Sequence, residues 1–335
     1  HHLNATQIIK LWMTGDKTIR TIISNMTYID MKWNFAKDFR WPASLLLSLP
    51  NLRVARISVA PGFESFGVKN FDFENLTGNL YKLDLQFPRL RFQPDEPLAT
   101  CFPHLGTLRL RMARPWKLND YAPLPHSLTE LEIQIDGSGD LLNLPSDFMP
   151  PNLSTLVLKL PLALPEMPEV WPQQLQKLHL CLQAPTTLRE FAPLFPPTLT
   201  DLSVSWFCAL VDGTRREAKY DDWQGRAGWK EILTPLKELL ALEIGFGHGQ
   251  LGKQDADFPE PEVLPARLVE LGFESQKKHL PSQPLLEQYH AQLPGLKQLL
   301  CDGKAFTVRA HHLGSRLAND AVHLNDLNSK PEIAS

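Results

Sequence analysis

Apolar residues recur along this chain in one repeated pattern, which is clearest in its middle third. Each copy has an apolar residue, a proline, two further residues, and then apolar positions spaced Leu-x-x-Leu-x-Leu-x-apolar. Such copies begin at Leu124, Met149, Trp171 and Phe195. Self-similarity at a period of about two dozen residues is typical of solenoids, in which each unit buries its apolar face against its neighbours.

The same spacing extends in both directions and defines eleven units. Their first leucine-like positions, here called anchors, are Met26, Leu52, Leu80, Leu105, Leu128, Leu153, Leu175, Leu199, Leu239, Leu268 and Leu296. Nine of the ten gaps between anchors are 22 to 29 residues, and one is 40 residues. Apolar residues three, five and seven positions after an anchor alternate with other residues, which indicates a short strand with one buried face. One such strand in every unit predicts a parallel sheet.

This pattern resembles the leucine-rich repeat family, roughly from Met26 to Gly303, and is also similar to bacterial and amoebal variants of it. The family form is Leu-x-x-Leu-x-Leu-x-x-Asn/Cys-x-Leu, and its first half is present throughout. Its asparagine occurs only in the first unit, as Asn34. The resemblance implies an α/β fold, a curved leucine-rich repeat solenoid with a parallel concave sheet. Each turn must then satisfy its buried backbone groups in some other way.

The units divide the chain into an N-terminal cap (residues 1–24), a solenoid (25–303) with an insertion at 207–230, and a C-terminal cap and tail (304–335). Residues 3–24 have helical spacing that Gly15-Asp16 interrupts, which predicts two short helices. This segment resembles the second half of an F-box, without the Leu-Pro first half. The other interpretation is a helical cap on the first repeat, which every solenoid needs.

The connectors between strands are expected to differ along the solenoid. Residues 43–49 and 284–293 can form helices, whereas 161–174 cannot, because its prolines remove amide donors and disfavour the α region before them. The 40-residue gap contains the insertion. It combines Tyr220, Trp223 and Trp229 with arginines such as Arg226, the residue types that dominate interface energetics. The alternative is a surface loop whose aromatic residues fold back on the last strand.

Composition excludes several classes of protein. The net charge is −3 and charged residues make up 21%, so the chain lacks the basic footprint of nucleic-acid binding. No apolar run reaches the eighteen or so residues of a membrane span. The four cysteines are scattered, which favours a reducing, cytoplasmic location. Against this stand sequons at Asn4, Asn25, Asn75 and Asn152, which we interpret as chance matches.

Catalytic and cofactor signatures are weak. Residues 247–253 contain the motif Gly-x-Gly-x-x-Gly. A phosphate site needs a helix directly after such a loop, and the acidic, proline-containing segment that follows is not expected to form one. His179 and Cys181 share a strand face without a third orienting group, so they make no catalyst. His311-His312 lacks accompanying metal ligands. We therefore expect no enzyme activity, no cofactor and no metal.

Residues between the buried leucines are long, polar and of both charge signs, which suits a protein partner better than a polyanion. The expected partner-binding residues are Asp84, Arg109, Arg111, Glu132, Lys159 and His179 on the sheet, and Tyr220, Trp223, Arg226 and Trp229 on the insertion. The function expected is non-enzymatic protein binding. The F-box resemblance implies substrate recognition for a ubiquitin ligase, with an adaptor at the N-terminus. The alternatives are an extracellular or effector leucine-rich repeat protein, and a nucleotide-binding enzyme.

Overall fold

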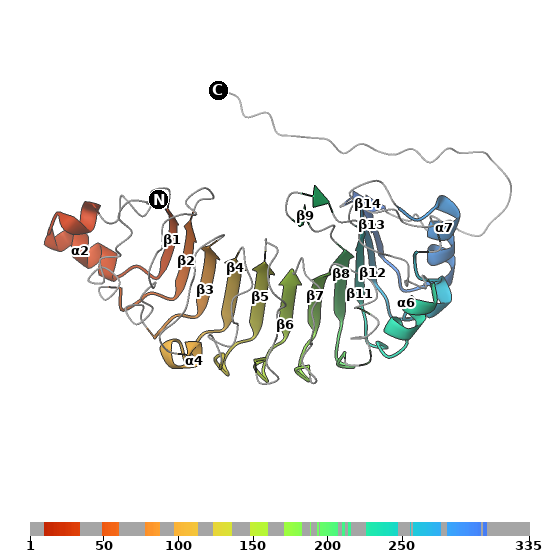
Figure 1. Ribbon diagram of the computed structural model, residues 1–335, viewed down its shortest axis with the longest axis horizontal. Helices are drawn as coiled ribbons and strands as arrows, with labels where there is room; N and C mark the ends of the chain where they lie inside the picture. The colour runs from red at the N-terminus through yellow and green to blue at the C-terminus, as the bar shows by residue number, and fades with distance from the viewer. Residues whose placement is uncertain are drawn as a thin grey trace, which may run out of the picture.

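A computed structural model describes residues 10–33, 49–59, 78–87, 97–112, 123–135, 148–159, 171–182, 188, 193, 195–206, 210–211, 214–215, 226–246, 255, 257–275, 280–302 and 304–306. Their main feature is one twelve-stranded sheet whose strands follow one another along an arc (Figure 1). The parallel strands are β1 (Tyr28–Trp33), β2 (Val54–Val59), β3 (Lys82–Phe87), β4 (Thr107–Met112), β5 (Glu130–Ile135), β6 (Thr155–Lys159), β7 (Lys177–Leu182), β8 (Asp201–Trp206), β11 (Ala241–Phe246), β12 (Glu270–Ser275) and β13 (Gln298–Cys301). The short β14 (Lys304–Phe306) runs antiparallel to β13. Within the described residues there is thus one parallel strand for each of the eleven predicted units.

The register of these strands confirms the repeat. The residue three positions after each anchor lies beside its equivalent in the next unit, so one apolar row runs through the sheet. That row is Ile29, Ala55, Leu83, Leu108, Leu131, Leu156, Leu178, Leu202, Leu242, Leu271 and Leu299. All of its members are buried. The fold is therefore the leucine-rich repeat solenoid that the sequence pattern predicts.

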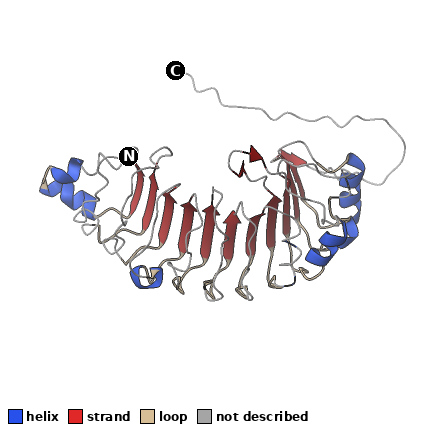
Figure 2. Cartoon of the chain, viewed as in Figure 1, coloured by secondary structure: helices blue, strands red, loops and turns tan. Residues whose placement is uncertain are grey.

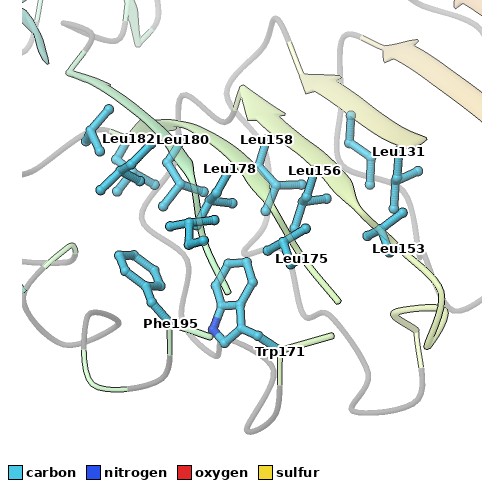
Figure 3. Packing of buried hydrophobic residues seen from close by; sticks show 14 of the residues in the cluster. Leu131, Leu153, Leu156, Leu158, Trp171, Leu175, Leu178, Leu180, Leu182 and Phe195 are labelled. Carbon is cyan, nitrogen blue, oxygen red and sulfur yellow. The ribbon is translucent and has the colours of Figure 1, made fainter. Parts of the chain in front are cut away.

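The proline of the repeat begins a tight turn that leads into each strand. The amide of Leu128 donates to the carbonyl of Pro125 at 3.0 Å, and Leu153, Leu175 and Leu199 make the same bond to their prolines. A donor three residues after its acceptor closes a β-turn. Proline is well suited to the first position, where only its carbonyl is needed. The apolar residue before it enters the core, where Trp171 and Phe195 pack edge to face at 5.7 Å between ring centroids (Figure 3).

Side-chain hydrogen bonds link neighbouring turns just before the strands. The residue just before an anchor is often Asn, Ser or Thr, and its side chain donates to a carbonyl of the preceding turn. The Nδ2 atom of Asn152 donates to the His126 carbonyl at 2.9 Å, and Asn51, Asn79, Ser127 and Thr198 make equivalent bonds. These bonds link neighbouring turns. They also provide donors for turn carbonyls that accept no hydrogen bond within the sheet.

Helices lie near the ends of the arc and outside the sheet (Figure 2). At the N-terminal end, residues 10–13 and α2 (Lys17–Ser24) confirm the two short helices that flank Gly15-Asp16. The Asp16 carboxylate caps α2 by accepting from the Thr18 and Ile19 amides at 2.7 and 3.2 Å. At the other end, α7 (Gln283–Gln292) confirms the expected helix at 284–293. A short helix, α4 (Leu98–Cys101), precedes β4. Residues 43–48 and 160–170 lie outside the described residues.

The 40-residue gap between anchors contains three further elements. A small hairpin pairs β9 (Leu210–Val211) with β10 (Thr214–Arg215), and α6 (Arg226–Leu233) follows. The sheet continues across the gap, because β8 pairs directly with β11. A 3₁₀ helix, η4 (Pro261–Val263), then fills part of the next connector. None of the described helices combines the length and apolarity that crossing a bilayer would require.

Candidate partner-binding surface

Strand residues that alternate with the buried ones form the second face of the sheet, here called the open face. On β1 to β12 these positions make three rows. One lies at the strand starts and from β3 onwards is Lys82, Thr107, Glu130, Thr155, Lys177, Asp201, Ala241 and Glu270. The two further along the strands are here called the first and second rows. The first row is Asp30, Arg56, Asp84, Arg109, Glu132, Val157, His179, Ser203, Glu243 and Gly272. The second row is Ser58, Gln86, Arg111, Gln134, Lys159, Cys181, Ser205, Gly245 and Glu274. Parallel strands lie about 4.8 Å apart, so the order of charges along a row decides which ion pairs form.

On β1 to β3 the first row places one guanidinium between two carboxylates. The Arg56 Nε lies 2.8 Å from the Asp84 Oδ2, and the Arg56 NH1 lies 3.9 Å from the Asp30 Oδ2. Asp84 is 4% exposed, and its Oδ1 accepts from the Gln86 amide at 3.3 Å. The hydrogen bond and the charge of Asp84 raise the pKa of Arg56. Arg56 offsets one of the two carboxylates, so this part of the first row carries one surplus negative charge.

On β4 to β6 the arrangement is reversed. The Glu132 carboxylate lies between two cations, 3.3 Å from the Arg109 Nε and 3.1 Å from the Lys159 Nζ. The register places Asp84 and Glu132 on either side of Arg109. Of these two neighbours, Asp84 is held by Arg56, and Arg109 pairs with Glu132. Three of the four expected residues on β4 to β6, Arg109, Glu132 and Lys159, are thus brought together.

Arg111 adds a third cation to the same region. It is exposed, on the same strand as Arg109 and two residues along. In the second row its neighbours are Gln86 and Gln134, and Lys159 follows one strand further on. Between β4 and β6 the open face therefore carries three cationic side chains and two carboxylates, Glu132 and the exposed Glu130 at the start of β5.

Beyond β6 the second row changes to small residues. The Cys181 Sγ and the Ser205 Oγ are 2.8 Å apart. A Cβ atom on Gly245 would lie 2.7 Å from the Ser205 Cβ, so side chains of neighbouring strands converge and the open face is concave here. Cys181 lies on this face, as predicted, but its neighbours bury it, and it is 1% exposed. Burial raises the pKa of its thiol to about 12, which removes it as a nucleophile at neutral pH.

His179 lies on the same strand as Cys181, in the first row. Its neighbours there are Val157 and Ser203, and it is partly buried. Burial lowers the pKa of the imidazole, and the positive charge of Lys159 lowers it further. The neutral form is therefore favoured at physiological pH. His179, one of the expected binding residues, is therefore an uncharged residue of the open face.

The last strands carry carboxylates on the open face. Glu243 on β11 and Glu274 on β12 are both exposed, and the Ser203 hydroxyl donates to the Glu243 Oε2 at 2.8 Å. Gly245 and Gly272 occupy the other first- or second-row position of each of these strands, and Glu270 adds a third exposed carboxylate at the start of β12. The carboxylates therefore stand above a low surface. None of the three glutamates is among the binding residues expected from the sequence, although each follows the alternation of its strand.

The structure corrects the expectation for Trp229. This residue lies on α6, is 0% exposed, and packs edge to face against Trp206 with 5.8 Å between ring centroids. Its indole Nε1 donates to the Asp257 carbonyl at 2.8 Å. It is a core residue and offers no surface to a partner. The alternative given for the insertion, with aromatic residues folded back on the last strand, is right for this residue, because Trp206 ends β8. Tyr220, Trp223 and the side chain of Arg226 lie outside the described residues.

The segment after the Gly-rich loop favours no nucleotide site. Residues 247–254 themselves are outside the described part of the chain. Beyond them the Asp255 carboxylate accepts from the amide and hydroxyl of Ser282 at 2.8 and 2.6 Å. Among the residues described after the loop, the first helical element is η4, a single 3₁₀ turn. A phosphate-binding loop instead leads directly into an α-helix. Among the described residues, no three His, Cys, Asp or Glu side chains meet in a way that could hold a metal ion.

Apolar side chains are exposed at the N-terminal end of the solenoid. Met13 is 76% exposed and Ile22, on α2, is 64% exposed. Ile23, on the same helix, is buried against the first repeat. The helix thus caps the core with one side and presents apolar groups on another.

Comparison with known proteins adds two distant structural likenesses. No family model matches the chain, and no curated protein matches it. The chain is similar to CroV588, described as a circular leucine-rich repeat protein, with 16% identity and a TM-score of 0.36 over 82% of this chain and 43% of that one. It is also similar to YopM from Yersinia enterocolitica WA-314, with 20% identity and a TM-score of 0.22 over 69% of this chain and 62% of that one. The chain thus spans less than two thirds of either protein, and the fold assignment rests on the strand register described above.

Proposed function

We propose that this protein is a non-enzymatic protein-binding module that holds a partner on the open face of its sheet. One observation carries the proposal: a face of ten first-row and nine second-row positions, most of them polar, is arranged by the repeat into a continuous charged surface. Mixed charge fixes the orientation of a protein partner and disfavours wrong ones. An extended surface of this kind is what solenoids use for recognition.

A crosslinking experiment tests this proposal. A photoreactive amino acid is placed at Gln134 on the open face, and in a matched control at Glu262 on η4, which is exposed and away from that face. Partner proteins should be captured from cells through position 134 and not through position 262. Equal capture at both positions, or capture through position 262 alone, would contradict the proposed use of the open face.

The finer proposal is that the module recognises substrates for an F-box type ubiquitin ligase in a reducing, intracellular compartment. The capping helix α2 and the exposed Met13 and Ile22 support an adaptor-binding role. Cys181 and Cys301 are buried free thiols, which supports a reducing environment. The alternative is an extracellular or effector leucine-rich repeat binding protein, for which the open face would serve equally well.

Co-purification separates these two possibilities. An F-box adaptor protein should co-elute with the chain, and Met13→Asp with Ile22→Asp should abolish co-elution because the apolar contact is lost. The matched control is Lys10→Asp with Thr18→Asp, two exposed residues of the same helical region. Failure of the unaltered chain to retain the adaptor would defeat the ligase role and leave the binding module in place.

A further inference from the structure

The charges of the open face are sorted along the solenoid. The region of β4 to β6 has three cations, Arg109, Arg111 and Lys159, and two carboxylates, Glu130 and Glu132, so cations are in excess. The region of β11 and β12 has three exposed carboxylates, Glu243, Glu270 and Glu274, and no cation among its six open-face positions. A ligand that crosses both regions meets opposite signs.

Between these regions the open face has no net charge. The open-face residues of β7 and β8 are Lys177 and Asp201, which pair at 3.6 Å at the strand starts, and His179, Cys181, Ser203 and Ser205 further along. A hydrogen bond joins the side chains of Cys181 and Ser205. The neutral form of the His179 imidazole is favoured. The convergence of Ser205 and Gly245 makes this part of the face concave. A polypeptide backbone can approach the first- and second-row part of this surface closely, because no long charged side chain stands in those two rows on β7 and β8.

We infer that the open face binds an extended polypeptide segment that is bipolar, with acidic side chains over β4 to β6 and basic side chains over β11 and β12. From β5 to β12 there are five strand steps of about 4.8 Å, so the two charged groups of the ligand are about 24 Å apart. At about 3.3 Å per extended residue, the segment spans about seven residues between them. This inference rests on the proposed function and names the chemistry of the partner.

A nucleic acid fits this face poorly. Its phosphates follow one another without interruption, and those beyond β8 would lie against Glu243 and Glu274. Glu132 would repel a dense polyanion within the cationic region as well, whereas separate carboxylates can bind on either side of it. A purely acidic peptide satisfies only one of the two charged regions. A bipolar peptide is complementary to both.

Selection from a displayed library of random nine-residue peptides on the purified full chain tests the inference. Enriched peptides should carry Asp or Glu in one half and Lys or Arg in the other. Arg111→Glu with Lys159→Glu should reduce the enrichment of acidic residues at least tenfold, and Glu243→Lys with Glu274→Lys should do the same for basic residues. The matched controls carry equal changes of charge at exposed sites away from the face: Lys230→Glu with Lys237→Glu, and Glu262→Lys with Glu287→Lys.

Three results would overturn the inference: enrichment without charge order, equal losses in the face variants and their controls, or tighter binding of a fluorescent twenty-nucleotide single strand than of the best selected peptide. Circular dichroism of each variant establishes that it is folded. If position 134 crosslinks to partners but no bipolar peptide is enriched, the inference fails and the proposed function stands. If neither occurs, both fail.

Discussion

Equivalent residues of the repeat take different roles according to what surrounds them. Lys159 and Cys181 occupy the same second-row position on neighbouring strands. Lys159 reaches the Glu132 carboxylate, whereas Cys181 is covered and bonded to Ser205. Position in the repeat determines the face on which a side chain lies, and the size and charge of its neighbours determine whether it remains accessible.

Trp229 provides a prediction at the residue scale. Trp229→Ala should lower the free energy of unfolding by about 3–5 kcal/mol, because it removes a fully buried aromatic side chain. Urea denaturation followed by circular dichroism measures this loss. Met13→Ala serves as the control, since Met13 is 76% exposed and its truncation should change stability by less than about 0.5 kcal/mol. Near-native stability of Trp229→Ala would mean that α6 does not pack against β8.

His179 gives a prediction about pH. Its folded-state pKa is lowered below the ordinary value of 6.5 by burial and by the charge of Lys159. The unfolded chain therefore binds the proton more readily than the folded one. The contribution of neutral His179 to the free energy of unfolding is complete above pH 6.5 and is lost as the pH falls through the folded-state pKa. Between about pH 7.5 and about pH 5, His179→Gln should lose less stability than the unaltered protein. Parallel profiles for the two proteins would contradict this assignment.

At the scale of elements, the turn and the strand of each unit have different structural roles. The Pro-x-x-Leu turn directs the anchor leucine into the core, and the side chain just before the anchor bonds to the preceding turn. The strand then adds buried apolar residues that alternate with open-face residues. Where β8 meets β11, the open-face side chains converge enough that the second row requires glycine at position 245.

This convergence predicts an energetic coupling between two strands. Gly245→Ala alone should cost about 1–3 kcal/mol, because its Cβ would overlap the Ser205 Cβ. In the Ser205→Gly background the same change should cost less, since the opposing Cβ is absent. A double-mutant cycle by chemical denaturation should give a coupling of at least about 0.5 kcal/mol. Purely additive effects would show that the strands separate freely at this point.

At the scale of the whole molecule, stability accumulates unit by unit. The leucines of each unit pack against those of the neighbouring units, as Figure 3 shows for the units that contain Leu156 and Leu178. No unit buries its apolar face alone. Losses in the middle of the sheet should therefore affect both of its halves.

Leu156→Ala and Leu178→Ala should each lower the free energy of unfolding by about 2–5 kcal/mol, because they truncate leucines in the buried row. Lys159→Ala is the matched open-face control, and its loss should stay within about 1 kcal/mol, the range of an exposed ion pair. Thermal and chemical denaturation measure all three. A cost for Lys159→Ala equal to that of the leucine variants would contradict the assignment of the two faces.

The sequence by itself determined the fold class, the eleven units, the register and the face of each strand residue. These follow from local spacing, because period-two alternation and a repeat of about two dozen residues allow one arrangement that buries every leucine. Tertiary structure decided the rest. Trp229 lies in the core because α6 packs on β8, and the Asn, Ser and Thr bonds between turns join residues more than twenty positions apart. Glu132 is shared by two cations and Cys181 is covered because those outcomes depend on the distances between strands and the sizes of side chains brought together by folding.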